Sequence, residues 1–262
     1  MSRQVIVLGA TGFIGRALAT ELEKRGYSVI RASRTGKDVS VDLTDIDQVM
    51  ELPDADAVVN AAGLGKVDGL EGGRNRWDKV NVSGVENLGR RYGDTFFVHV
   101  SSLAAKGLAG DYSGESTEPE LPYSKSKRAS EVAVEENFSS YAIVRPGFVY
   151  DEGEVPGLLR FAARFGVLPA SSARTPAVHR QELVERIGEM VDAREEGVYD
   201  VGEGIRPAEL ARRAGYSGIE VPVPGPAVLL LGTFGELLRR LGFAVPGKVR
   251  ARSILSDQDL VR

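Results

Sequence analysis

A tyrosine and a lysine four residues apart are the first pair in this sequence that could do chemistry. Tyr123 and Lys127 follow Pro122, and proline is favoured in the first turn of a helix. Residues four apart share a helix face, so the ammonium would lie beside the phenol. A nearby positive charge favours the phenolate and would lower the phenol pKa from its usual ~10. Such a tyrosine could exchange a proton with a substrate oxygen near neutral pH, although this spacing alone is common.

A second group of residues could bind phosphate. Gly9, Gly12 and Gly15 directly follow the apolar run Val5–Leu8 and open a helical pattern. Glycines let backbone N–H groups approach a pyrophosphate without a Cβ in the way, and a helix N-terminus adds partial positive charge. At a strand–helix junction this spacing predicts dinucleotide binding; a turn that needs positive φ is the alternative.

The end of the second expected strand indicates which dinucleotide is bound. Dinucleotide folds often place an acidic residue there, ~20 residues after the glycines, to bind the ribose hydroxyls. Ser33 and Arg34 stand at that place instead, and residues 26–37 contain no Asp or Glu. A hydroxyl and a guanidinium would bind a 2′-phosphate, which a carboxylate would repel. We therefore expect NADP rather than NAD; the alternative is that Arg34 is an ordinary surface charge.

Alternating apolar runs and helical patterns must position these residues. The runs that predict strands are Val5–Leu8, Tyr27–Ala32, Val39–Val41, Ala57–Val59, Phe96–Val100, Ala142–Val144 and Val198–Val201. Between them apolar residues recur at helical spacing, and Gly26 stands where the first helix should end. Runs that are apolar throughout are typical of a parallel sheet covered on both faces. The pattern predicts an α/β fold, a doubly wound Rossmann-type parallel sheet.

This regular alternation breaks up after Pro146. Residues 151–154 are acidic, residues 166–176 are rich in Ala, Ser and Pro, and the strongly apolar pattern 227–241 predicts a late helix. That helix could dock a partner, or pack on the core of its own lobe. We expect a dinucleotide-binding Rossmann domain of residues 1–150 and 177–203. A small, discontinuous C-terminal substrate-binding lobe would comprise residues 151–176 and 204–262.

Composition excludes several classes of protein. The chain of 262 residues is 42% hydrophobic, enough for a core, and corresponds to about 1.7 typical domains. The absence of Cys excludes disulfides and Cys-ligated metal centres, and we expect no metal site. A net charge of −4 argues against a nucleic-acid partner. With no spanning apolar run and no signal-like N-terminus, we expect a soluble, cytoplasmic protein without a membrane partner.

Taken in order, the motifs resemble those of the extended short-chain dehydrogenases/reductases, the NAD(P)-dependent family that includes nucleotide-sugar epimerases and dehydratases. The resemblance covers about residues 1–203. It rests on the glycine loop, Asp42-Leu43, Asn60-Ala61-Ala62-Gly63, the helix with Asn81, the strand end Ser101-Ser102, Tyr123 with Lys127, and Arg145-Pro146.

This resemblance implies a role for each motif. Tyr123 would be the catalytic acid/base, Lys127 would lower its pKa and hold the nicotinamide ribose, and Ser102 would hydrogen-bond the substrate oxygen, with Ser101 as the alternative. The implied cofactor-binding residues are Gly9, Thr11, Gly12, Phe13, Ile14, Gly15, Ser33, Arg34, Asp42, Leu43, Ala61, Ala62, Gly63, Asn81, Tyr123, Lys127 and Pro146, of which Asp42 and Leu43 would contact the adenine. We expect His99 and His179 to be structural.

The resemblance implies an NADP-linked enzyme for a hydroxyl/carbonyl couple of a small or sugar-like substrate, as a reductase, dehydrogenase, epimerase or dehydratase. The alternative is a non-catalytic NADP(H)-binding scaffold or redox-sensing subunit, whose usual mark is a lost tyrosine or lysine. Lys106-Gly107 departs from the Tyr-Gly that is usual in the family, and the C-terminal lobe is short. The short lobe favours a substrate smaller than a nucleotide sugar. The resemblance also suggests a homodimer through helices at 81–91 and 123–137.

Overall fold

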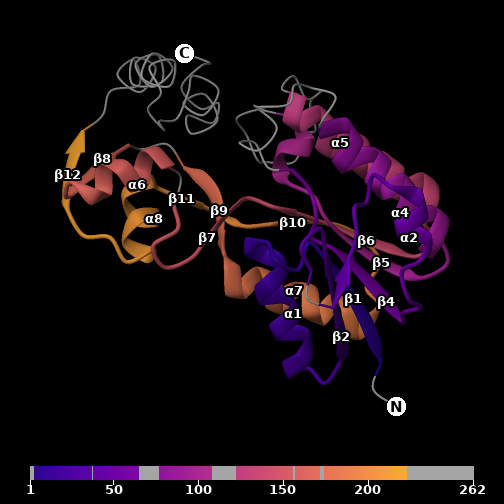
Figure 1. Ribbon diagram of the computed structural model, residues 1–262. Coiled ribbons are helices and arrows are strands. Elements are labelled where there is room, and N and C mark those ends of the chain that lie inside the picture. Colours follow the sequence, from indigo (N-terminus) through magenta and orange to yellow (C-terminus); the bar gives the residue numbers. More distant parts are fainter. Residues whose placement is uncertain are drawn as a thin grey trace. The chain divides into compact units, whose positions relative to one another are not determined.

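The computed structural model describes residues 3–36, 38–64, 77–107, 122–155, 157–171 and 174–222 (Figure 1). The chain divides into two compact units. Unit 1 comprises Met1–Gly107, Thr117–Pro146 and Arg180–Val201, and unit 2 comprises Leu108–Ser116, Gly147–His179 and Gly202–Arg262. The residues expected to do chemistry all lie in unit 1.

A seven-stranded parallel sheet forms the centre of unit 1. Its strands are β1 (Gln4–Leu8), β2 (Ser28–Ser33), β3 (Val39–Ser40), β4 (Ala57–Asn60), β5 (Phe96–Val100), β6 (Tyr141–Pro146) and β10 (Gly197–Val201). Their order is β10-β6-β5-β4-β1-β2-β3, with every neighbouring pair parallel. This confirms the expected α/β fold. The order reverses between β1 and β4, the point at which doubly wound sheets bind ligands beyond the carboxyl ends of their strands.

Helices cover both faces of this sheet (Figure 1). They are α1 (Phe13–Lys24), α2 (Ile46–Met50), α4 (Gly84–Tyr92), α5 (Pro122–Asn137) and α7 (Arg180–Ala193), with a π-helix η1 (Lys79–Ser83) before α4 and a 3₁₀-helix η2 (Leu103–Lys106) after β5. Helix α1 packs against α7, whereas α2, α4 and α5 form the layer on the other face. As expected, α5 begins at Pro122.

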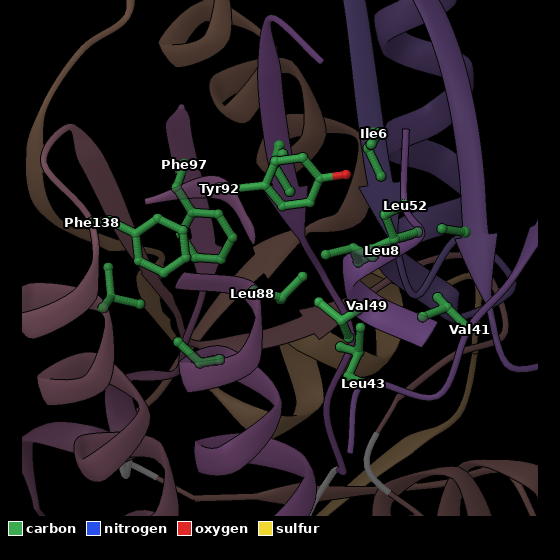
Figure 2. Packing of buried hydrophobic residues seen from close by; sticks show 14 of the residues in the cluster. Ile6, Leu8, Val41, Leu43, Val49, Leu52, Leu88, Tyr92, Phe97 and Phe138 are labelled. Atoms are coloured by element: carbon green, nitrogen blue, oxygen red, sulfur yellow. The ribbon is translucent and has the colours of Figure 1, made fainter. Parts of the chain in front are cut away.

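Alternate residues of each strand fill these two layers, because successive side chains of a strand point to opposite faces. Ile6 and Leu8 of β1 belong to a buried cluster with Leu88 and Tyr92 of α4 and Phe97 of β5 (Figure 2). Fully burying each such side chain contributes about 1.5–3 kcal/mol. The strands therefore read as continuously apolar because both of their faces are covered.

The end of α1 fixes where β2 begins. Gly26 has φ +89°, its N–H donates to Glu23 O at 2.9 Å, and Tyr27 N–H donates to Leu22 O at 3.1 Å. These are the paired bonds of a Schellman motif, in which glycine adopts the left-handed conformation that other residues avoid. The sequence prediction for Gly26 is confirmed.

Unit 2 has two small sheets of its own. The strands β7 (Phe148–Tyr150), β9 (Thr175–His179) and β11 (Glu203–Ile205) form one, and β8 (Val167–Ala170) pairs with β12 (Ile219–Pro222) in the other. The helices α6 (Gly157–Arg164) and α8 (Pro207–Arg213) belong to the same unit. Because β9 pairs with β7 and with β11, residues 147–150, 177–179 and 202–203 group with unit 2 rather than with the Rossmann domain, where they were expected. The apolar pattern 227–241 lies outside the described residues. Among the helices that are described, none has the length and apolarity to span a bilayer.

Candidate active site

The segment after β1 places Gly9 against the loop after β4 and packs Gly12 and Gly15 against Gly9 itself. Gly9 has φ +73°, and a Cβ there would lie 2.7 Å from Ala62 Cα. A Cβ on Gly15 would overlap the Gly9 carbonyl, so only glycine allows α1 to start this close to the strand. Gly12 is the N-cap of α1 and provides no side-chain cap to its first N–H groups. Such N–H groups, at the positive end of the helix dipole, are suited to an anion.

The other expected cofactor-binding residues of this segment keep part of their surface exposed. Thr11 is exposed, and Phe13 and Ile14 are half-buried. Arg180 of α7 lies over the Phe13 ring, with Cζ 4.6 Å from the ring centroid. Arg180 adds a positive charge beside the loop that the sequence analysis had not singled out.

At the end of β2 lies a buried hydroxyl with an unused hydrogen-bonding capacity. Ser33 is 8% exposed, and within the described part of the chain its Oγ has no hydrogen-bond partner. Arg34 beside it is exposed, and its carbonyl accepts a bond from Ser40 Oγ at 3.1 Å. A buried hydroxyl without a partner costs free energy unless a ligand satisfies it. An orphaned hydroxyl next to an exposed guanidinium fits the oxygens of a phosphate.

Asp42 and Leu43 follow β3. The Asp42 carboxylate accepts bonds from Thr44 N and Thr44 Oγ1, both at 2.9 Å. The bond from Thr44 N–H, the Thr44 hydroxyl and the charge of Arg34 lower the pKa of Asp42 despite its partial burial. Leu43 is buried, and its carbonyl accepts a bond from Asn87 Nδ2 at 2.9 Å.

Asn81 links the loop after β4 to α5. It is buried in the π-helix η1; its Oδ1 accepts from Leu64 N at 2.8 Å and its Nδ2 donates to Ser126 Oγ at 3.1 Å. A Cβ on Gly63 would lie 3.1 Å from Asn81 Oδ1 and 3.5 Å from Lys127 Nζ. Two residues expected to bind the cofactor, Asn81 and Lys127, therefore meet at Gly63, a third. Single π-turns within helices are often found at functional sites.

Lys127 is a buried cation. It is 7% exposed, and its Nζ donates to Val100 O at 3.1 Å. Burial lowers the pKa of Lys127 to about 8, although the charge of Glu131 opposes this shift. Near neutral pH the side chain is therefore an ammonium, and above pH 8 it increasingly loses its charge.

Tyr123 and Ser102 are in contact through a side-chain hydrogen bond. That bond lowers the pKa of Tyr123, but desolvation of the phenol is the larger effect and leaves the pKa raised above its usual value. The expectation that Lys127 makes the pKa of Tyr123 lower than usual is therefore wrong for this structure. Burial penalises the phenolate, and this effect exceeds that of the bond to Ser102.

Of the two serines at the end of β5, Ser102 lies with Tyr123. Its Oγ also accepts a bond from Ala104 N at 3.2 Å, which caps η2. Ser101 Oγ donates instead to Glu131 Oε1 at 2.5 Å and is buried. Ser101 is therefore engaged away from the phenol. Pro146 is buried at the end of β6.

His99 is a buried structural residue, as expected. Its Nδ1 lies 3.3 Å from Asn60 Nδ2, and its Nε2 lies 3.0 Å from Ser130 Oγ. An amide Nδ2 can only donate, so we assign the His99 proton to Nε2. Burial, with a smaller effect of Lys127, lowers the pKa of His99 well below its usual value. His179 lies in unit 2, where its Nε2 is 3.3 Å from Asp151 Oδ1.

The sequence analysis missed the acidic residue of this site. Glu131 has no exposed surface and binds Ser101 and Arg145. Its position was visible in the sequence, because it stands four residues after Lys127 and eight after Tyr123, on the same face of the predicted helix. Only the fold shows that Arg145 and Ser101 meet it there.

Known proteins resemble this chain in sequence and in structure. The family model for the RmlD substrate binding domain matches residues 3–165. A ceramide reductase from Caulobacter vibrioides is 30% identical over 253 residues, which cover 84% of this chain and 74% of that protein. A dTDP-4-dehydrorhamnose reductase from Mycolicibacterium smegmatis is 27% identical over 205 residues, covering 73% of this chain and 61% of that relative, less than two thirds of its length.

Among solved structures, dTDP-4-dehydrorhamnose reductase from Bacillus anthracis in complex with NADP is similar to this chain. The two superpose with a TM-score of 0.73 at 20% identity, over 96% of this chain and 97% of that one. At this level of identity the likeness establishes the fold.

Proposed function

This chain belongs to the RmlD substrate-binding-domain family of the extended short-chain dehydrogenases/reductases, and we propose that it is an NADP-dependent reductase of a ketone on a small or sugar-like substrate. Members of this family are NAD(P)-dependent reductases and epimerases, so the chain is an oxidoreductase of this type. The observation that carries the proposal is the contact of Ser102 with Tyr123 beside the buried ammonium of Lys127.

The residues of unit 1 fit NADP. The glycine loop and the uncapped start of α1 would hold the pyrophosphate. The orphaned Ser33 hydroxyl and Arg34 would hold the 2′-phosphate, which supports NADP over NAD. Gly63, Asn81 and Lys127 would form the nicotinamide end, where the Lys127 ammonium has N–H groups beyond the one given to Val100 O.

The side chains of Ser102, Tyr123 and Lys127 would bind the substrate oxygen and transfer a proton to it. When bound, the reduced cofactor supplies the hydride. The Ser102 hydroxyl would orient the carbonyl oxygen, and Tyr123 Oη would give it a proton. The raised pKa of Tyr123 keeps the phenol protonated in the free protein, which is the form a proton donor needs. Lys127, as an ammonium, would stabilise the phenolate that remains.

The candidate substrates are those that the relatives and the size of the lobe indicate. Both curated relatives are named reductases, one of ceramide and one of dTDP-4-dehydrorhamnose. The length of the C-terminal lobe does not discriminate between a nucleotide sugar and a smaller ketone, because the Bacillus anthracis dTDP-4-dehydrorhamnose reductase is matched over 97% of its own length. A nucleotide sugar therefore belongs among the candidate substrates, together with smaller ketones.

Two measurements test the function. Native mass spectrometry of the purified chain should detect bound NADP(H) rather than NAD(H). Loss of NADPH absorbance should then be followed with dTDP-4-dehydrorhamnose, a ketone-bearing ceramide and a set of small keto sugars. Consumption of NADPH with at least one ketone supports the reductase. Tight binding of NADPH without turnover on any of these ketones favours the non-catalytic scaffold.

A further inference from the structure

A buried carboxylate lies on the helix face that carries Tyr123 and Lys127, and the proposed chemistry does not use it. Glu131 stands one turn after Lys127 and two turns after Tyr123 on α5. Its side chain is 0% exposed. Burial of an ionised carboxylate is costly unless the group is paired and fully hydrogen-bonded. The hydrogen-bond partners of Glu131 therefore indicate its role in the site.

Four hydrogen bonds saturate this carboxylate. Oε1 accepts from Ser101 Oγ at 2.5 Å and from Arg145 Nε at 2.9 Å. Oε2 accepts from Arg145 Nη2 at 2.7 Å and from Arg128 Nη1 at 3.1 Å. A carboxylate offers about four lone-pair sites, so each of them is in use. Through these charge-assisted bonds, Glu131 joins α5 to the ends of β5 and β6.

The segment that carries Ser102 is tied at both of its ends to this network. Ser101, immediately before it, binds Glu131. At the far end of η2, Lys106 Nζ donates to Asp200 Oδ2 at 2.6 Å. Asp200 Oδ1 in turn lies 3.9 Å from Arg145 Nη1, and Arg145 returns to Glu131. Ser102 therefore lies between two anchors of one ion-pair network.

We propose that Glu131 is a positioning residue of the active site: through Ser101 and Arg145 its carboxylate fixes Ser102, on the β5 end, against Tyr123 and Lys127 on α5. The inference rests on the proposed function, because it concerns the alignment of the groups that act there. Glu131 itself contacts neither substrate nor cofactor. It acts by holding Ser102, at the end of β5, in position relative to Tyr123 and Lys127 on α5.

Glu131 also affects the charge of Lys127. Its negative charge opposes the effect of burial on the Lys127 pKa. Two further ionisable groups face this region. His99 on β5 has a pKa well below its usual value and stays neutral above pH 7, whereas burial raises the pKa of Tyr123 above its usual value. Glu131 is thus the group that favours the ammonium among these three.

A lysine titration tests the charge effect without cofactor or substrate. Protein labelled with ¹³C at lysine Cε is titrated by NMR, and the Lys127 signal is assigned by its loss in Lys127→Met. The wild-type midpoint is expected at about pH 8. Glu131→Gln keeps the shape and removes the charge, and should move the midpoint down by about one pH unit or more. Arg128→Ala removes a bond to the same carboxylate but keeps its charge, and should not move the midpoint down. A folded Glu131→Gln protein with the wild-type midpoint would contradict the effect of Glu131 on the charge of Lys127.

Ser101→Ala tests the alignment and does not depend on Glu131→Gln folding. It cuts the tie to β5 but leaves the carboxylate paired with Arg145. We expect an unchanged Lys127 midpoint, an NADPH Kd within about twofold of wild type, and a kcat about tenfold lower or worse, as misplaced groups cost rate rather than binding. A wild-type kcat in Ser101→Ala contradicts the positioning role. If the wild-type protein turns over none of the ketones, the proposed function fails instead, and the lysine titration still tests the effect of Glu131 on Lys127.

Discussion

The ammonium of Lys127 is buried and donates to the carbonyl of Val100, and burial of this charge destabilises the fold. Its pKa is about 8 in the folded protein, against ~10.4 for an unfolded lysine. The unfolded chain therefore binds more protons between these values, and the free energy of unfolding rises as the pH is raised from 8 to about 10. Below pH 8 the whole cost of burying the charge is present.

Lys127→Met should therefore stabilise the protein while damaging its function. The full shift corresponds to about 3 kcal/mol, of which the lost bond to Val100 O offsets ~1, leaving a gain on the order of 1–2 kcal/mol at pH 7. Urea unfolding at pH 7 and pH 10 measures the effect, which should vanish at pH 10. Lys125→Met, two residues away and exposed, is the control and should change neither value. A large loss of stability in Lys127→Met at pH 7 would contradict this account.

Binding of NADPH should weaken as the pH rises through about 8, because the proposed function assigns the ribose to the protonated form of Lys127, whose pKa is about 8. Above this pH the affinity should fall by up to about tenfold per unit, the limit for one proton. Fluorescence titration of NADPH from pH 6.5 to about 9.5 measures it. The dependence should be absent in Lys127→Met; a dependence that persists there would assign it to another group.

Arg34 should carry the choice between the two dinucleotides. A charge-assisted contact to the 2′-phosphate contributes about 1–3 kcal/mol, so NADPH should bind the wild type about five- to a hundredfold more tightly than NADH. Arg34→Ala should remove most of that preference and leave the affinity for NADH unchanged. Calorimetric titration of both cofactors into both proteins checks this. Equal affinity of the wild type for NADH and NADPH would refute the NADP assignment.

At the scale of elements, the glycines after β1 are needed because the start of α1 packs closely against the backbone of Gly9, where a Cβ would not fit. A Cβ at Gly15 overlaps the Gly9 carbonyl, so Gly15→Ala should force α1 away from β1, cost about 1–3 kcal/mol and weaken NADPH binding. Gly12→Ala brings a Cβ only to 3.1 Å from the same oxygen and should be milder in both respects. Urea unfolding and NADPH titration compare the pair. The reverse ranking would mean that the loop differs from this description.

The central strands β1, β4 and β5 were predictable because they are buried on both faces and therefore almost entirely apolar (Figure 2). Gly26 was predictable because one residue type suits a left-handed helix end. The pairing of β7 with β9 was not, since it depends on residues far apart in the chain. The predicted direction of the Tyr123 pKa shift was wrong for a similar reason. Spacing along a helix places Lys127 near the phenol, but burial is a property of the fold.

At the scale of the whole molecule, the family membership and the two units support an enzyme in which unit 1 holds the cofactor. The substrate-binding role of unit 2 stays a prediction, as does a homodimer through α4 and α5. Fold alone does not separate a reductase from a scaffold that holds NADPH. The two functions differ in whether the Tyr123 hydroxyl gives a proton to a substrate.

Turnover and NADPH affinity of Tyr123→Phe, measured on the same preparation, test the central claim most directly. The substitution keeps the ring and its packing but removes the proton that Tyr123 Oη would transfer. The account predicts that kcat falls by about 10²–10⁴ while the NADPH Kd changes by less than about twofold, because the phenol hydroxyl is not assigned to hold the dinucleotide. A Tyr123→Phe protein that reduces the ketone at the wild-type rate would contradict the account, whatever the fold.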